Sequence, residues 1–231
     1  MRVCRGITSS VPFLLFLLCA VPPGALADDD IKAKIAAAGD AAKHNADAVV
    51  VLEETDVRVR PSGIGTARNH AVTKVLRDAA IRTLAVQAFE FDPHTNRLEL
   101  IAVRVYRADG KVEEVSLDNK VQQPQPAWGV FWGTQQYLVS VPHLNIGDAV
   151  ETIAEMTGFN VAYLADSAGE TPTSGDEQLN AYGEVLHPPV AGNWHDEVHF
   201  WSNSPIIEKR YRVRLPKDKP LQYEIYNGEL P

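Results

Sequence analysis

The chain has 231 residues, with 22 Lys and Arg against 30 Asp and Glu, which gives a formal net charge of −8 at pH 7. This acidic balance, without a stripe of Lys or Arg, argues against nucleic acid as a partner. The length allows one well-buried core, built as one β-sandwich or as two small packed lobes.

The first 27 residues have the features of a secretory signal peptide. Arg2 and Arg5 precede an apolar run from Val11 to Val21, and Ala25-Leu26-Ala27 forms a small-x-small cleavage site. The apolar run is shorter than a membrane span requires. We therefore expect an exported protein, periplasmic or secreted, with no stable membrane span after the signal peptide is cleaved.

Residues 28–45 (DDDIKAKIAAAGDAAKHN) predict one short N-terminal helix. The three Asp residues at its start, and Lys43 and His44 near its end, complement the helix dipole. Ile31 and Ile35 lie four residues apart and would share one face, whereas Gly39 weakens the middle. We expect this helix to pack against a sheet or to fray in part.

Residues 46–231 predict strands and turns. Residues 84–115 read as a meander of three strands, joined by the turn at residues 92–96 and by Asp109-Gly110, where Gly accepts the positive φ of a hairpin turn. Alternating or β-branched segments predict further strands at residues 49–60, 66–76, 135–141, 149–157, 194–201, 205–215 and 221–226. The fold class that follows is all-β: an antiparallel β-sandwich-like module with one short N-terminal helix after a signal peptide.

Two irregular segments interrupt these strands. Residues 118–133 form a loop rich in Pro, Gln and aromatic residues, and residues 160–193 form a long loop rich in Gly, Pro, Ser and Thr. A loop this long inside a domain is usually functional or mobile, and simple mobility is the preferred interpretation here.

The first candidate binding group is aromatic: Trp128, Phe131, Trp132 and Tyr137, in and after the first loop. Aromatic side chains clustered in a Gly- and Pro-containing loop can form a platform for a sugar or a peptide. The alternative, which we favour, is a loop that folds back to cover the core.

The second candidate is the segment His195-Asp196-Glu197-Val198-His199. Two His residues four apart on a helix can bind one zinc ion. The surrounding Trp, Val and Phe residues favour a strand instead, where residues four apart are separated by about 13 Å. We therefore expect no metal site. The solvated or groove-lining face of the strand would carry His195, Glu197, His199 and Trp201, and the opposite face would carry Trp194, Asp196, Val198 and Phe200.

No other motif indicates catalysis. Cys4 and Cys19 both leave with the signal peptide, so the mature chain has neither a disulfide nor a thiolate nucleophile. No Ser lies in a G-x-S-x-G elbow, and no phosphate-binding glycine loop is present. Neighbouring carboxylates such as Glu53-Glu54 would point to opposite faces of a strand. We expect a protein without catalytic residues, metal or cofactor.

Five segments, in this order and spacing, resemble an exported bacterial family, the domain of unknown function 3857: residues 46–57 (ADAVVVLEETDV), 68–76 (RNHAVTKVL), 91–112 (FDPHTNRLELIAVRVYRADGKV), 137–151 (YLVSVPHLNIGDAVE) and 204–223 (SPIIEKRYRVRLPKDKPLQY). The resemblance implies an all-β envelope module that precedes a transglutaminase-like domain with a Cys-His-Asp triad. This chain stops at Pro231 without a cysteine in its mature part, so no catalytic residue can be carried over.

Three hypotheses follow. The first is a non-catalytic β-module that binds or positions a partner domain, a peptide or a glycan through residues 128–137 and the face of His195 and His199. The second is a metal-dependent hydrolase that uses these two His residues. The third is the N-terminal fragment of a longer transglutaminase-like protein.

Overall fold

A computed structural model describes residues 23–125, 133–160 and 177–228 of the chain. Within these residues the elements are α1 (Pro23–Ala38), α2 (Ala41–His44), β1 (Ala48–Val59), β2 (Gly65–Val75), α3 (Asp78–Leu84), β3 (Val86–Phe91), β4 (Asn96–Tyr106), β5 (Val112–Glu114), β6 (Val121–Pro124), β7 (Gln135–Ser140), β8 (Ala149–Gly158) and β9 (Lys209–Arg214).

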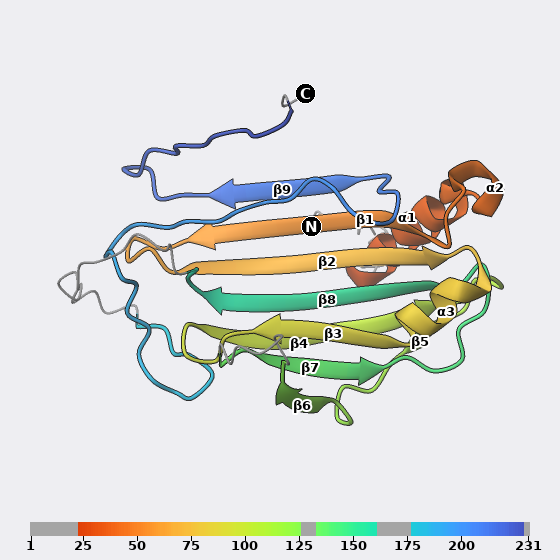
Figure 1. The fold of residues 1–231 in the computed structure, drawn as a ribbon, viewed down its shortest axis with the longest axis horizontal. Coiled ribbons are helices and arrows are strands. Elements are labelled where there is room, and N and C mark those ends of the chain that lie inside the picture. Colours follow the sequence, from red (N-terminus) through yellow and green to blue (C-terminus); the bar gives the residue numbers. More distant parts are fainter. Residues whose placement is uncertain (1–22, 126–132, 161–176, 229–231) are drawn as a thin grey trace, which may run out of the picture.

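The strands form a six-stranded sheet in the order β5-β4-β8-β2-β1-β9 and a three-stranded sheet in the order β3-β7-β6 (Figure 1). All pairs are antiparallel except β1 with β9, which runs parallel to it along one edge of the large sheet. The all-β fold class with a short N-terminal helix, predicted from the sequence, is confirmed.

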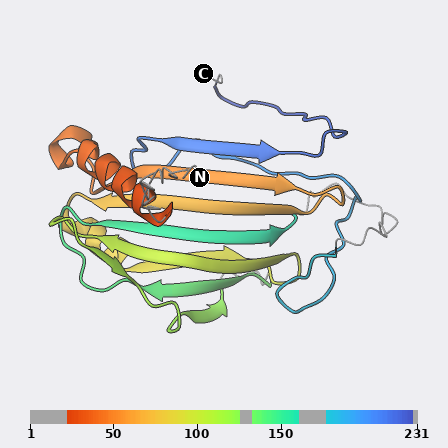
Figure 2. The ribbon, with the colours of Figure 1, turned by 180° about the vertical axis from the view of Figure 1, so that it is seen from behind.

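The large sheet is covered on both faces at one of its ends. On one face α3 and the three-stranded sheet enclose an apolar cluster that includes Val75, Val103, Val139 and Val150. On the other face α1 packs over the sheet (Figure 2) and encloses a second cluster with Ile31, Ile35, Leu52 and Val72. Burial of each such side chain contributes about 1.5–3 kcal/mol, so these two clusters hold the three layers together.

The N-terminal helix differs from the prediction of one helix over residues 28–45. The chain breaks at Gly39, which has φ +83°, and restarts at α2, whose first turn is capped by the carboxylate of Asp40. The predicted contact with the sheet is present. Lys74 of β2 donates to the carbonyls of Ile35 and Gly39 at 3.0 and 2.9 Å, which satisfies carbonyls at the end of α1.

The predicted meander over residues 84–115 is wrong in its first half. All three strands and the hairpin at Asp109-Gly110 are present, and β4 pairs with β5. However, β3 pairs with β7 in the small sheet, and β4 pairs with β8 in the large one. The turn at Asp92 therefore carries the chain from one sheet to the other, because both strands find longer ladders with distant partners.

Further differences concern the C-terminal third. The predicted strands over residues 194–201 and 221–226 join neither sheet, and the strand predicted over residues 205–215 is shortened to β9. Helix α3 and strand β6 lie where the sequence predicted no regular element.

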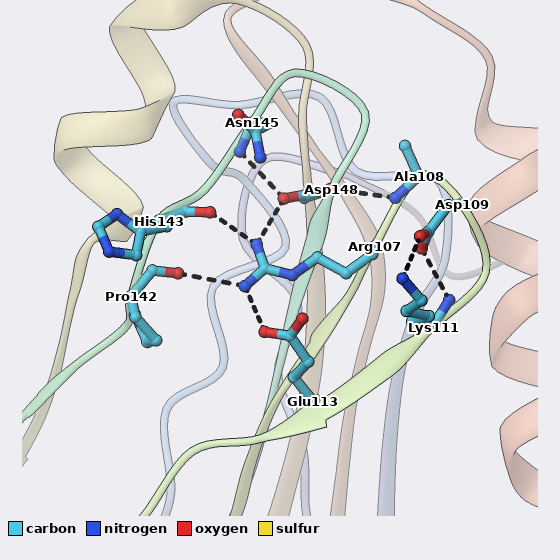
Figure 3. A network of polar contacts seen from close by, with 9 residues as sticks. All are labelled: Arg107, Ala108, Asp109, Lys111, Glu113, Pro142, His143, Asn145 and Asp148. Atoms are coloured by element: carbon cyan, nitrogen blue, oxygen red, sulfur yellow. Dashed lines mark hydrogen bonds and ion pairs between the residues drawn. The ribbon is translucent and has the colours of Figure 1, made fainter.

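A polar network fastens two turns at the end of the large sheet (Figure 3). The carboxylate of Asp148, which is buried, accepts from Arg107 Nη1 at 2.8 Å and from the backbone N–H groups of Ala108 and Asn145, each at 3.0 Å. Arg107 also donates to Glu113 and to the carbonyl of His143. The network ties the β4–β5 hairpin to the connection between β7 and β8, and every group in it is used within the fold.

Candidate binding groove

A groove of about 500 Å³ lies on the large sheet, next to the edge strand β9. Its floor comes from alternate residues of β1 and β2, among them Thr55, Val57, Ala67 and Asn69. On β2 these odd-numbered residues share a face with Val75, which packs under the small sheet. The groove therefore occupies the part of this face that the small sheet leaves uncovered.

One wall of the groove is an extended segment, residues 192–204, which we call the strap. At its start Gly192 N–H donates to the carbonyl of Ser62 at 2.8 Å, in the turn between β1 and β2. Just beyond its end, Ile206 forms a parallel bridge with Val50 of β1. The strap is thus fixed at both ends to the β1–β2 hairpin.

The middle of the strap is held by Asp196. Its carboxylate accepts from the hydroxyl of Tyr211 on β9, and from Asn160 Nδ2 at 3.0 Å beyond the end of β8. Burial, and then the neighbouring carboxylate, raises the pKa of Tyr211, so its hydroxyl stays protonated and donates. Asp196 therefore joins the strap to two elements of the sheet.

Polar groups on the floor are arranged for hydrogen bonding. Thr55 Oγ1 donates to Asn69 Oδ1 at 2.8 Å, and no described residue accepts from Asn69 Nδ2, which leaves two amide donors for a ligand. Lys209 Nζ donates to Glu53 Oε1 at 2.6 Å, and its ammonium lies 5.8 Å from the ring centroid of Phe200.

Aromatic rings complete the groove. Trp194 fits against Gly65, where an added Cβ would lie 2.9 Å from the indole Nε1. Trp201, at the far end of the strap, is 71% exposed, and its ring centroid lies 5.8 Å from that of His199. An exposed indole beside open amide donors gives the site an apolar platform and a polar floor.

The sequence-predicted residues divide between two places. His199 lines the groove, and His195 is exposed on the strap. The predicted alternation holds from Trp194 to His199, where Trp194, Asp196 and Val198 are half-buried, but it fails at Phe200, which is exposed. No ladder hydrogen bond joins the strap to another described residue. Tyr137 lies apart on β7, stacked on Phe91 with ring centroids 5.0 Å apart. Trp128, Phe131 and Trp132 lie outside the described residues.

The hypothesis of a metal-dependent hydrolase requires a group of side chains that can bind a metal ion. Within residues 23–125, 133–160 and 177–228, no three His, Cys, Asp or Glu side chains come together as a set that could hold a metal ion. His199 instead lies 3.7 Å from Glu197, which is exposed.

Sequence reasoning missed most of the groove floor. Thr55 and Asn69 face each other in the β1–β2 hairpin, whereas Lys209 and Tyr211 come from β9, which is distant in sequence. The pairing of β1 with both strands brings the four residues together. The available signal was the small residue pair Gly65 and Ala67 on the groove face of β2, which leaves room above the sheet.

The fold defines an all-β module with an open groove on one face of the large sheet. The model of DUF3857, described as a domain of unknown function with a solved structure, matches residues 61–230, and the chain belongs to this family. No curated protein matches the chain. No helix among the described residues has the length and apolar character to cross a membrane.

Two solved structures match part of the chain at low similarity. One is a candidate protease from Parabacteroides distasonis, 11% identical, with a TM-score of 0.45 over 51% of this chain and 24% of that protein. The other is a mutant M1 zinc metallopeptidase from Deinococcus radiodurans bound to a Tyr-Ser-Ala substrate, 14% identical, with a TM-score of 0.32 over 75% of this chain and 34% of that protein. The chain spans about a quarter and a third of these proteins, and neither likeness bears on its activity.

Proposed function

We propose that the protein is a non-catalytic glycan-binding module of the cell envelope, and that the groove beside β9 holds the glycan. The observation that supports this proposal most directly is the exposed indole of Trp201 on a groove whose lysine, Lys209, is paired with Glu53. The signal peptide predicted from the sequence supports a location outside the cytoplasm.

The pairing of the groove's lysine argues against an anionic ligand. Lys209 is bound by Glu53 at 2.6 Å, and Asp196 accepts from Tyr211 and Asn160. An anionic group of a ligand would need an unpaired cation, since burying a lone charge is costly, and Lys209, the one Lys or Arg among the described residues that line the groove, is already paired with Glu53. The carboxylates of Asp196 and Glu197 also line the groove and can accept from hydroxyl groups. Paired polar groups and the amide of Asn69 can instead donate to and accept from sugar hydroxyls.

The aromatic residues favour the same ligand. The faces of sugar rings carry C–H groups, and a flat indole such as Trp201 offers a matching apolar surface without closing the groove.

The test is a titration with short linear oligomers of N-acetylglucosamine and of glucose, followed by intrinsic tryptophan fluorescence. We expect saturable binding of at least one series. Trp201→Ala should weaken it by roughly tenfold, the equivalent of about 1.4 kcal/mol, without changing the thermal midpoint. Asn69→Ala should weaken it as well, because the amide donors are lost.

The matched control is Tyr182→Ala. Tyr182 is also an exposed aromatic residue, at 57%, but it does not line the groove. Its replacement should leave glycan affinity unchanged. No saturable binding of either series, or equal losses in the Trp201 and Tyr182 variants, would overturn the proposal. A transglutaminase-like partner domain, which the family resemblance implies, stays a prediction.

A further inference from the structure

The free edge of the large sheet lies along β9. In its parallel pairing with β1, the backbone groups of Arg210, Arg212 and Arg214 face β1. Those of Lys209, Tyr211 and Val213 point outward, and no strand within the described residues pairs with them. An unpaired edge of this kind is a template for an added strand.

The edge carries a row of basic side chains, paired with carboxylates, on the face opposite the groove. Arg212 binds Glu54 and Asp56 at 2.7 and 3.2 Å, and Arg214 binds Asp56. The Arg212 and Arg214 side chains are 49% and 51% exposed, whereas Glu54 and Asp56 are each 23% exposed. The Arg side chains therefore lie further out than the carboxylates that pair with them.

The C-terminal segment, residues 221–226 (LQYEIY), which we call the tail, has the complementary pattern. Leu221, Tyr223 and Ile225 alternate with Gln222 and Glu224. The apolar three are exposed, Tyr223 by 71%. Such alternation with large exposed apolar side chains is typical of a strand that lacks its neighbour.

The tail does not fill the edge of its own sheet. It runs back beside β9 in both views (Figures 1 and 2), but no backbone hydrogen bond joins the two among the described residues. The segment that connects β9 to the tail contains Pro216 and Pro220. It also contains a turn in which Lys219 N–H donates to the Pro216 carbonyl at 3.0 Å. Two proline rings restrict how this connection can tighten into a hairpin.

We propose that the tail of one copy adds to β9 of a second copy as an antiparallel strand, and that reciprocal exchange forms a two-fold symmetric dimer. With Glu224 opposite Arg212, Tyr223 lies opposite Val213 and Ile225 lies opposite Tyr211. This single register places the acidic residue against the basic row and the apolar residues against one another. A reciprocal exchange fills both free edges at once.

The first test is sedimentation velocity of the full-length protein over a range of concentrations. We expect a monomer–dimer equilibrium. Tyr223→Ala and Glu224→Lys should each raise the dimer dissociation constant at least tenfold. The matched controls are Val121→Ala, an exposed apolar residue on the edge strand β6, and Asp109→Lys, an exposed carboxylate, and both should leave the constant unchanged.

The second test distinguishes pairing of the tail with β9 of a second copy from pairing of the tail with β9 of the same chain. Val213→Cys and Tyr223→Cys are placed in two different chains, each with Cys4→Ser and Cys19→Ser, and the chains are co-expressed and oxidised. Exchange predicts a disulfide that links the two kinds of chain. A monomer at every concentration, a dimer insensitive to the tail variants, or only an intrachain disulfide when one chain carries both cysteines would overturn the proposal.

Discussion

His70 Nε2 lies 2.7 Å from Oε1 of Glu151, a residue that is only 2% exposed. The second oxygen of this carboxylate accepts from Arg104 at 3.0 Å and from the hydroxyl of Tyr106 at 3.3 Å. These partners come from β2 and β4, which flank β8. One buried carboxylate therefore cross-links three neighbouring strands on the face that carries α1.

Removal of this carboxylate should be costly. In Glu151→Ala, Arg104 and His70 lose a buried acceptor, and we expect the free energy of unfolding to fall by about 3 kcal/mol. Urea denaturation measures the change. Glu155→Ala is the matched control, because Glu155 lies on the same strand and face but is half-exposed. Equal losses in both variants would contradict a special role for the buried group.

The same site predicts how stability depends on acid. Burial raises the pKa of Glu151, but hydrogen bonds and charge from His70 and Arg104 outweigh it and hold the pKa below the usual 4.5. A lowered pKa in the folded state gives stability that is full above the unfolded pKa and is lost as the pH falls through the folded pKa. The thermal midpoint should therefore decline below about pH 4.5, less steeply in Glu151→Gln; parallel curves would contradict this.

Removal of the Asp148 carboxylate should destabilise the two turns that it joins, at Ala108 and Asn145, more than the strands. Asp148→Ala leaves Arg107 and the N–H groups of Ala108 and Asn145 without their acceptor, at a cost of about 3 kcal/mol. Hydrogen exchange should accelerate most at those two amides. Asp109→Ala is the control, because it removes only exposed contacts with Lys111 inside the same hairpin. It should cost less stability and leave exchange at Asn145 unchanged. Unchanged exchange at Ala108 in the Asp148 variant would show that the network does not hold the turn.

The sequence predicts those parts of the fold that depend on neighbouring residues. The β1–β2 hairpin and the turn at Asp109-Gly110 follow from alternation and from the φ preference of Gly. The partners of β3 and β4 could not be predicted the same way. Both strands alternate, and the choice between a hairpin and two separate sheets depends on β7 and β8, more than 40 residues later in the chain.

The candidate site likewise has a part that could be predicted from the local sequence and a part that could not. The exposed face of His195 and His199 was predictable, because it follows from alternation along one segment. The groove was not, since Asn69, Asp196 and Tyr211 meet only after β9 has paired with β1 and the strap has crossed the sheet. Such long-range placement leaves no mark on the local sequence.

The position of the strap should depend on Gly63. This residue has φ +91°, and a Cβ added there would lie 2.2 Å from the backbone carbonyl oxygen of Asn193 at the start of the strap. Gly63→Ala should therefore displace the strap, lower stability by more than the roughly 1–2 kcal/mol that a left-handed alanine costs, and weaken glycan binding.

Gly110→Ala separates the backbone effect from the contact. Gly110 has nearly the same φ, +88°, but an added Cβ would meet nothing within 4 Å. The free energy of unfolding of the Gly110→Ala variant should fall only by the cost of the left-handed conformation, as measured by urea denaturation. Its affinity for the oligosaccharide, measured by tryptophan fluorescence, should not change. If the two alanine variants lost the same stability and both kept their affinity, the close approach of Asn193 to Gly63 would not be what positions the wall of the groove.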